Sequence, residues 1–240
     1  MLDSADEFNI ETFDLIGFKG SEFISKLIIH IQRNALHDRH FSIDNFPEIS
    51  HVGLAIHGKD MKPFMGNVLS EFCGKINESE IYVFESTASG TPFDRAKDVF
   101  KQFHFGVQLR SLNILIDKYP GKIYWSSKLF KTNEDHYLKL ANCIKDLNHK
   151  PFEKSLKVLL SNFCEFSKVK QTKNSFFCSE LVARILQRSN ILPRKINPEK
   201  VVPFDFYIDP RNPEKTLDVD GEVPILYKNP VRIKFVTYFL

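Results

Sequence analysis

The sequence predicts an α+β protein with a mainly antiparallel sheet and helices grouped on it. Strand-like alternation recurs in the first half of the chain, helical spacing dominates from residue 134 to about 190, and two strand-like runs come near the C-terminus. No internal repeat or low-complexity linker divides the 240 residues. We therefore expect a single domain that covers residues 1–240.

The distribution of charged residues indicates no particular class of binding partner. The 33 basic and 30 acidic residues give a net charge of +3 and are interspersed along the chain. A nucleic-acid-binding surface or a polybasic membrane patch would gather basic residues in one stretch. We therefore expect no nucleic acid as a partner.

The cysteines and the N-terminus favour a cytoplasmic protein. The four cysteines form no C-x-x-C pair and lie in no His-rich zinc spacing, and they are Cys73, Cys143, Cys164 and Cys178. This pattern favours free thiols in a reducing compartment, with no metal and no cofactor. The acidic N-terminus lacks the features of a secretory signal, and no apolar run is long enough for a transmembrane segment.

The first elements alternate between strand and helix. Residues 13–18 form a short apolar strand that Gly20 closes, and residues 21–35 place apolar side chains at helical spacing, namely Phe23, Ile24, Leu27, Ile28 and Ile31. Residues 50–57 form the next strand, in which large apolar side chains alternate with His51, Gly53 and Ala55. The two small residues leave room beside His51.

Three further strands are expected before the helical part of the chain. An excursion over residues 58–79, which contains Pro63, Gly66 and Gly74, leads to a strand at residues 80–87. Residues 122–130 form another strand, and residues 106–112 are a candidate for a fourth.

The second half of the chain begins with helices. Helical spacing predicts helices over residues 134–147 and 151–166, and a third helix that begins at or just before Cys178. After Ile191 the chain is rich in proline, and it contains the segment 203–209 and the late strand-like runs 223–227 and 231–239.

A histidine and a carboxylate are expected to meet at one edge of the sheet. Strands that follow each other in sequence are often antiparallel neighbours, so the start of residues 50–57 lies beside the end of residues 80–87. His51 is near that start and Glu85 is near that end, on compatible faces. A carboxylate beside an imidazole fixes its tautomer and stabilises its protonated form. Ser86 and Thr87 are alternative hydrogen-bonding partners for the ring.

Cys178 stands at the start of an amphipathic helix. Leu181, Val182, Ile185 and Leu186 make the apolar stripe, and Glu180, Arg184, Gln187 and Arg188 are expected on the wet side. A thiol at a helix N-terminus with a protonated histidine beside it has a lowered pKa. The resulting thiolate attacks carbonyl groups, and the backbone N–H of the cysteine helps to bind the oxyanion.

These residues also carry a resemblance to a known family. The motifs S-H-V-G at 50–53, F-E-S at 84–86 and F-C-S-E-L-V at 177–182 resemble the circularly permuted branch of the NlpC-type papain-like cysteine hydrolases. D-L-I at 14–16 and G-K-I-Y-W at 121–125 are similar to other parts of those domains. In papain the cysteine helix precedes the histidine strand, whereas here it follows, which is the permuted order.

The resemblance implies a permuted papain-like fold with a core over about residues 13–206 and a C-terminal extension over about residues 207–240. It implies Cys178 as the nucleophile, His51 as the general base and Glu85 as the third member of a triad. It also implies an acyl substrate. Relatives include peptidases and amidases, and enzymes related to the lecithin:retinol acyltransferases, so a peptide, an amide or a lipid acyl group is the expected substrate.

Other interpretations of the same residues stay open. One alternative is a catalytically silent binding or scaffold domain on the same fold, with the excursion at 58–79 covering the cleft. Another is a peripheral enzyme that hydrolyses or transfers lipid acyl chains. His37 and His40 are spaced for one side of a metal site but have no second cluster to complete it. The remaining cysteines, Tyr124, Trp125 and the aromatic run at 100–105 are expected to be packing residues.

Overall fold

The protein is described here by a computed structural model, which covers residues 9–21, 23–38, 48–87, 106–153, 175–206, 227 and 231–232. Its centre is a six-stranded sheet in the order β4-β3-β2-β1-β5-β6, and each neighbouring pair of strands is antiparallel. The strands are β1 (Leu15–Lys19), β2 (His51–His57), β3 (Ile81–Thr87), β4 (Gly106–Ser111), β5 (Lys122–Ser126) and β6 (Val231–Arg232). The α+β prediction with an antiparallel sheet is therefore confirmed.

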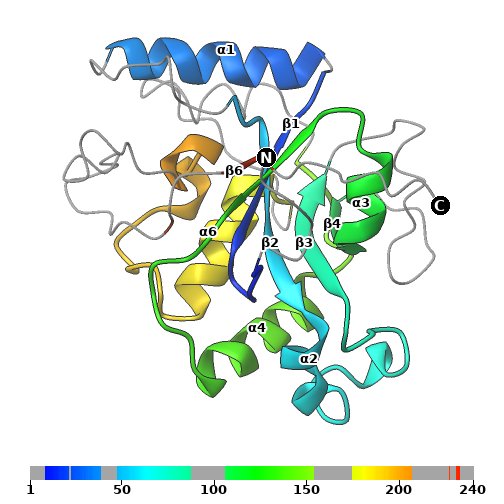
Figure 1. Cartoon of the computed structure of the whole chain (residues 1–240). Coiled ribbons are helices and arrows are strands. Elements are labelled where there is room, and N and C mark those ends of the chain that lie inside the picture. The colour runs from blue at the N-terminus through cyan, green and yellow to red at the C-terminus, as the bar shows by residue number, and fades with distance from the viewer. Residues whose placement is uncertain are drawn as a thin grey trace.

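Helices cover both faces of this sheet. They are α1 (Phe23–Asp38), α2 (Gly58–Met61), α3 (Leu112–Lys118), α4 (Glu134–Leu147) and α6 (Cys178–Arg188). Apolar residues of α4 and α6 pack in one cluster with Leu15, Val52 and Leu54, whereas α3 packs in a second cluster with Ile16 and Ala55. Strand residues of opposite parity thus face opposite layers, as the two-residue period requires. Figure 1 shows α1 crossing one end of the molecule, while α2 and α4 lie at the other end.

Several elements begin and end where the pattern placed them. The strands at 50–57 and 80–87 correspond to β2 and β3, residues 106–112 contain β4, and residues 134–147 are helix α4. Helix α6 starts at Cys178, and its four predicted apolar residues are buried. These segments have strong periodicity along their whole length, which is the condition under which a pattern sets the boundaries of an element.

Two predicted strands are displaced or shortened. The strand expected at 13–18 is Leu15–Lys19, because Phe13 has a positive φ of 75° and belongs to a turn in which the Asp14 N–H donates to the Glu11 carbonyl. The strand expected at 122–130 ends at Ser126. Beyond it, the Lys128 N–H donates to the Asp14 carboxylate at 2.9 Å, and Trp125 Nε1 donates to the same group at 2.7 Å. This buried carboxylate joins the start of β1 to the end of β5.

The segment after β2 is folded structure. It contains α2 and the 3-10 helices η3 (Lys62–Phe64) and η4 (Ser70–Phe72), and it buries Phe64, Leu69 and Phe72 in the core. It begins at His57, at the opposite end of a seven-residue strand from His51. Such a strand spans roughly 20 Å. Both ends of the excursion thus lie at the end of β2 away from His51, since His57 pairs with Ile81.

Other details differ from the prediction. Helix α3 was not foreseen; Ser111 caps it by accepting a hydrogen bond from the Ile114 N–H. In α1, Ile29 and Gln32 are buried, while Leu27, Ile28 and Ile31 are only partly buried. Pro151–Glu153 is extended, so the helix expected from residue 151 does not start there, and residues 154–166 lie outside the described residues.

The Pro-rich part after α6 supplies two 3-10 helices, η6 (Pro198–Lys200) and η7 (Pro203–Phe206). Of the late strand-like runs, Tyr227 forms a bridge with Lys128, and Val231–Arg232 is β6. The rest of both runs, and residues 207–209, lie outside the described residues.

Candidate active site

His51 and Glu85 meet at the edge of the sheet where β2 starts and β3 ends. Gly53 pairs with Glu85 across the two strands, so the carboxylate lies on the face that carries His51. Oε2 of Glu85 lies 2.5 Å from Nε2 of His51. Gly53 makes this approach possible, because a Cβ there would lie 3.0 Å from the Glu85 Cβ and 2.6 Å from Cγ1 of Val83. The predicted juxtaposition is confirmed.

Arg110 holds the other oxygen of the same carboxylate. It comes from β4, and its Nε and Nη2 both bind Oε1 of Glu85. Both side chains are buried. Burial by itself disfavours the charged carboxylate, but Arg110 and His51 outweigh this effect, so the pKa of Glu85 is lowered. Glu85 is therefore a carboxylate with one oxygen held by a guanidinium group and the other facing the imidazole.

Helix α6 delivers Cys178 to this edge. The helix packs on the face of β2 that bears Val52 and Leu54, and its first residue reaches the start of that strand. Two buried hydroxyl groups fix the segment: Ser86 Oγ donates to the Phe176 carbonyl, and Ser179 Oγ donates to the Val201 carbonyl, both at 2.7 Å. The chain is thus held by a hydrogen bond both before and after the candidate nucleophile Cys178.

Glu180, which was expected on the wet side of α6, is buried instead. Its Oε2 accepts a hydrogen bond from the Phe177 N–H at 3.3 Å, and its Oε1 accepts one from Arg184 Nε at 2.8 Å. A carboxylate in the first turn satisfies a donor that the helix leaves without a partner. The polar residue is buried because it caps the helix that presents Cys178.

The Cys178 side chain lies among hydrogen-bond donors. His51 and the backbone N–H groups of Val52 and Ser179 lie within interaction range of the thiol. Burial raises the pKa of a thiol, but the charge of His51 and these donors outweigh it, so the pKa of Cys178 is lowered. Cys178 as a whole residue is 8% exposed.

The imidazole is stabilised in its protonated form. Burial alone would lower the pKa of His51, but Cys178 and Glu85 outweigh this effect and raise it to about 10. Since Glu85 faces Nε2, the ring nitrogen left for the thiol is Nδ1. The opposite directions of the two pKa shifts favour the ion pair of a thiolate with an imidazolium over the neutral pair.

All three residues singled out in the sequence therefore come together. Of the alternative partners for His51, Ser86 points away, because its hydroxyl binds the Phe176 carbonyl. Arg110 was not foreseen as a member of the site. A signal for it exists in β4, where Gln108 and Arg110 alternate with apolar residues, but the register that places Arg110 beside Glu85 involves a third strand.

The remaining cysteines and aromatic residues differ from the site residues. Cys143 is buried, and burial raises its pKa to about 11, whereas Cys73 is exposed. Tyr124 and Trp125 pack against the two apolar clusters, as expected. Cys164, His40 and residues 100–105 lie outside the described residues, as does the His37 side chain. Among the described residues, no group of three or more His, Cys, Asp or Glu side chains is arranged to hold a metal ion.

Comparison with known proteins adds no relative. The sequence matches no protein-family model and no curated protein. In the described parts of the chain, none of the helices has the length and apolar character that crossing a membrane requires.

Proposed function

We propose that the protein is a thiol-dependent hydrolase or acyltransferase that works through Cys178, His51 and Glu85 on a permuted papain-like fold. The observation that carries this proposal is the contact between the Cys178 thiol at the N-terminus of α6 and an imidazole that a buried carboxylate holds from behind. The lowered pKa of the thiol supports a nucleophilic role, because only the thiolate attacks efficiently.

The chemistry follows from these positions. The thiolate attacks the carbonyl carbon of an amide, ester or thioester, and the oxygen takes the negative charge. The Cys178 N–H, which is the first of α6 and has no acceptor within the helix, is a donor for that oxyanion. Protonated His51 then gives its proton to the leaving group, which departs and leaves a thioester on Cys178. Water or another acceptor loses a proton to His51 and releases the acyl group.

Glu85 and Arg110 support this cycle without touching the substrate. Glu85 holds the ring so that Nδ1 faces the sulfur, and it stabilises the imidazolium that each proton transfer creates. Arg110 keeps Glu85 ionised in a buried position. The substrate is expected to be a peptide, an amide or a lipid acyl group.

Alkylation by iodoacetamide, followed by peptide mapping, tests the proposal. We expect Cys178 to react fastest among the cysteines at neutral pH, and intact mass to show a covalent adduct with an ester or thioester probe. Cys178→Ala should abolish this adduct, whereas the control Cys143→Ala should retain it. Equal alkylation rates at Cys178 and Cys143 would contradict the proposal and favour a binding or scaffold domain.

A further inference from the structure

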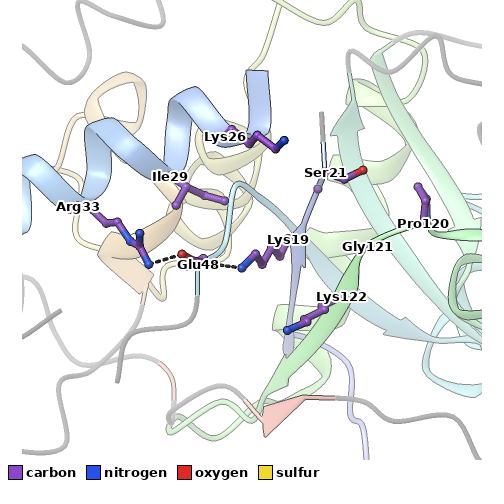
Figure 2. Close-up of a pocket in the computed structure, with 10 residues that line it drawn as sticks. Lys19, Ser21, Lys26, Ile29, Arg33, Glu48, Pro120, Gly121 and Lys122 are labelled. Atoms are coloured by element: carbon purple, nitrogen blue, oxygen red, sulfur yellow. Dashed lines mark ion pairs between the residues drawn. The ribbon is translucent and has the colours of Figure 1, made fainter. Parts of the chain in front are cut away.

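A pocket lined by basic side chains opens at the edge of the sheet where β2 starts. It has a volume of about 670 Å³ and lies between α1, the residues that lead into β2, the end of β1 and the start of β5. Its charged residues are Lys19, Lys26, Arg33, Lys122 and a single carboxylate, Glu48. Figure 2 shows Lys19 and Arg33 both turned toward Glu48, which pairs with each of them. Among the described lining residues, one carboxylate thus faces four cations.

The pocket is close to His51 along the sheet. Phe18 pairs with His51 across the two strands, and Lys19 is the next residue along β1, on the opposite face of the sheet from Phe18. The Ser50 hydroxyl, next to His51, accepts a hydrogen bond from the Gly20 N–H in the pocket wall. Helix α1 is tied to the same place, because Gln32 Nε2 donates to the Ile49 carbonyl at 3.1 Å.

The two strand lysines of the pocket lie on the sheet face that carries α6. Lys19 has the parity of Leu15, and Lys122 has that of Tyr124, and both apolar residues pack in the cluster that contains Cys178. The pocket therefore opens at the edge and on the face from which the helix brings its thiol.

This arrangement concentrates positive charge at one edge of the sheet. Lys19 and Lys122 are directly opposite each other on neighbouring strands, where like charges destabilise a sheet. Burial, together with the charges of Lys122 and Arg33, lowers the pKa of Lys19. Among the described residues, no carboxylate forms an ion pair with Lys26 or Lys122, so Glu48 alone offsets the four cations.

We propose that this pocket binds a phosphate group carried by the acyl compound on which Cys178 acts. The link to an acyl compound rests on the proposed cysteine chemistry, whereas the binding of phosphate does not. A dianionic phosphate matches the excess of positive charge better than a carboxylate does, and lysines bind phosphate as point charges. The volume exceeds the space that one phosphate fills and leaves room for the group that carries it.

The direct test measures binding of inorganic phosphate by calorimetry, with chloride at equal ionic strength as the reference. Lys26→Gln/Lys122→Gln removes two cations that hold no carboxylate in the described structure. Lys62→Gln/Lys139→Gln is the control, because it makes the same change in net charge far from the pocket. We expect at least about tenfold weaker binding in the pocket variant and unchanged binding in the control. No binding to the wild type, or equal weakening in both variants, overturns the proposal.

A second experiment tests whether the pocket lies close enough to Cys178 to affect its reactions. Iodoacetate is anionic and iodoacetamide is neutral, so the ratio of their rates at Cys178 reports the positive potential near the sulfur. We expect Lys26→Gln/Lys122→Gln to slow iodoacetate a few-fold at low salt and to leave iodoacetamide unchanged, while the control variant changes neither rate. An unchanged ratio in the pocket variant would separate the pocket from the nucleophile and overturn their assignment to one substrate.

Phosphate binding and alkylation of Cys178 test the pocket and the cysteine chemistry separately. Phosphate binding is measured again in Cys178→Ala, where it should be unchanged. If phosphate binds but Cys178 is not alkylated faster than Cys143, the hydrolase proposal is wrong. The pocket is then a phosphate site with no link to an acyl compound. If phosphate fails to bind while Cys178 is the fastest thiol, only the pocket proposal fails.

The phosphate has two possible sources, a soluble phosphomonoester or a lipid headgroup. Glycerol phosphate in solution and phosphatidic acid in phosphatidylcholine vesicles represent them. Binding of either one, weakened in the pocket variant and not in the control, supports the proposal and identifies the source. Binding of neither overturns it.

Discussion

Four ionisable side chains connect the interior of the protein to the proposed nucleophile, and their charges alternate in sign when Cys178 is a thiolate. Arg110 binds one oxygen of Glu85, the other oxygen faces His51, and His51 contacts Cys178. Each charge is buried or nearly so, and each has a partner of opposite sign, which is the condition under which buried charges are tolerated. The reactivity of the thiol therefore depends on side chains that lie beyond its direct contacts.

His51 controls the pH at which the thiol ionises. In the wild type, the pKa of Cys178 is lowered, so we expect the midpoint of iodoacetamide alkylation to lie below that of a free thiol, which is about 8.5. In His51→Gln the imidazolium is absent and burial, which raises the pKa, is no longer outweighed. We expect the midpoint to rise above about 8.5 and the rate at pH 7 to fall at least tenfold.

His57→Gln is the matched control, because it removes a histidine from the other end of β2. Its pH profile should coincide with that of the wild type. A profile of His51→Gln that also coincides with the wild type would show that the ring does not stabilise the thiolate.

Arg110 and Glu85 should be energetically coupled. Arg110→Met leaves a buried carboxylate with only His51 as a charged partner among the described contacts of Glu85, and we expect it to lower the free energy of unfolding by about 3 kcal/mol. In Arg110→Met/Glu85→Gln the uncompensated charge is gone. The loss should therefore be smaller than the sum of the two single losses by at least about 1 kcal/mol in urea unfolding.

The exposed pair Lys139–Asp135 serves as the reference for this cycle, because Lys139→Met should cost no more than about 0.5 kcal/mol. Additive losses at Arg110 and Glu85 would mean that the two side chains do not form the pair described above.

Strands β2 and β3 approach each other closely where they carry the site, and Gly53 is the reason. Its partner across the ladder is Glu85, and neither the Glu85 Cβ nor the Val83 side chain leaves room for a methyl group. Glycine is required at residue 53 because a side chain would not fit there, and not because the backbone needs a conformation that only glycine adopts.

Gly53→Ala should disturb stability and site together. The added methyl group meets Cγ1 of Val83 at 2.6 Å, and we expect a loss of about 1–3 kcal/mol in urea unfolding, with slower alkylation of Cys178 because Glu85 is displaced. Gly66→Ala is the control, since its added Cβ meets nothing within 4 Å and should change stability by less than about 0.5 kcal/mol. Equal stability of the two variants would contradict the packing argument.

Elements with an uninterrupted pattern were predicted best. The pattern gave β2, β3, α4 and α6 almost to the residue, because one face of each is consistently apolar. It failed where a local contact decides the boundary: the positive φ of Phe13 delays β1, the Asp14 carboxylate takes the Lys128 N–H at the end of β5, and Ser111 starts α3. These boundaries depend on a single backbone angle, on a contact between residues far apart in sequence, or on one capping atom. None of these features changes the alternation of apolar and polar residues from which the elements were predicted.

The site as a whole requires three segments that are distant in sequence to meet. The sequence predicted only some of the residues that take part. The pairing of His51 with Glu85 followed from neighbouring strands and parity. Arg110 and the buried Glu180 did not, because the first needs the register of β4 and the second needs the cap of α6. The basic pocket is assembled from α1, β1, β2 and β5, and no single stretch of sequence contains it.

One of the links that hold the cysteine segment against the sheet is a buried hydroxyl group. Ser86 Oγ on β3 donates to the Phe176 carbonyl at 2.7 Å across 90 residues of chain, two residues before Cys178. Ser86→Ala removes this buried hydrogen bond, and we expect a loss of about 1 kcal/mol in the free energy of unfolding. If local opening of the segment follows, hydrogen exchange at the Phe177 and Cys178 amides should accelerate about fivefold.

Ser126→Ala is the matched control for this link. Ser126 is equally buried in β5, but its hydroxyl has no hydrogen-bond partner in the described structure, so removing it breaks no hydrogen bond. We expect Ser126→Ala to be neutral or slightly stabilising and to leave exchange near Cys178 unchanged. Similar effects of the two substitutions would show that Ser86 contributes only its volume. A larger effect of Ser86→Ala, concentrated in the cysteine segment, would show that β3 holds the nucleophile in place as well as carrying the carboxylate that orients its base.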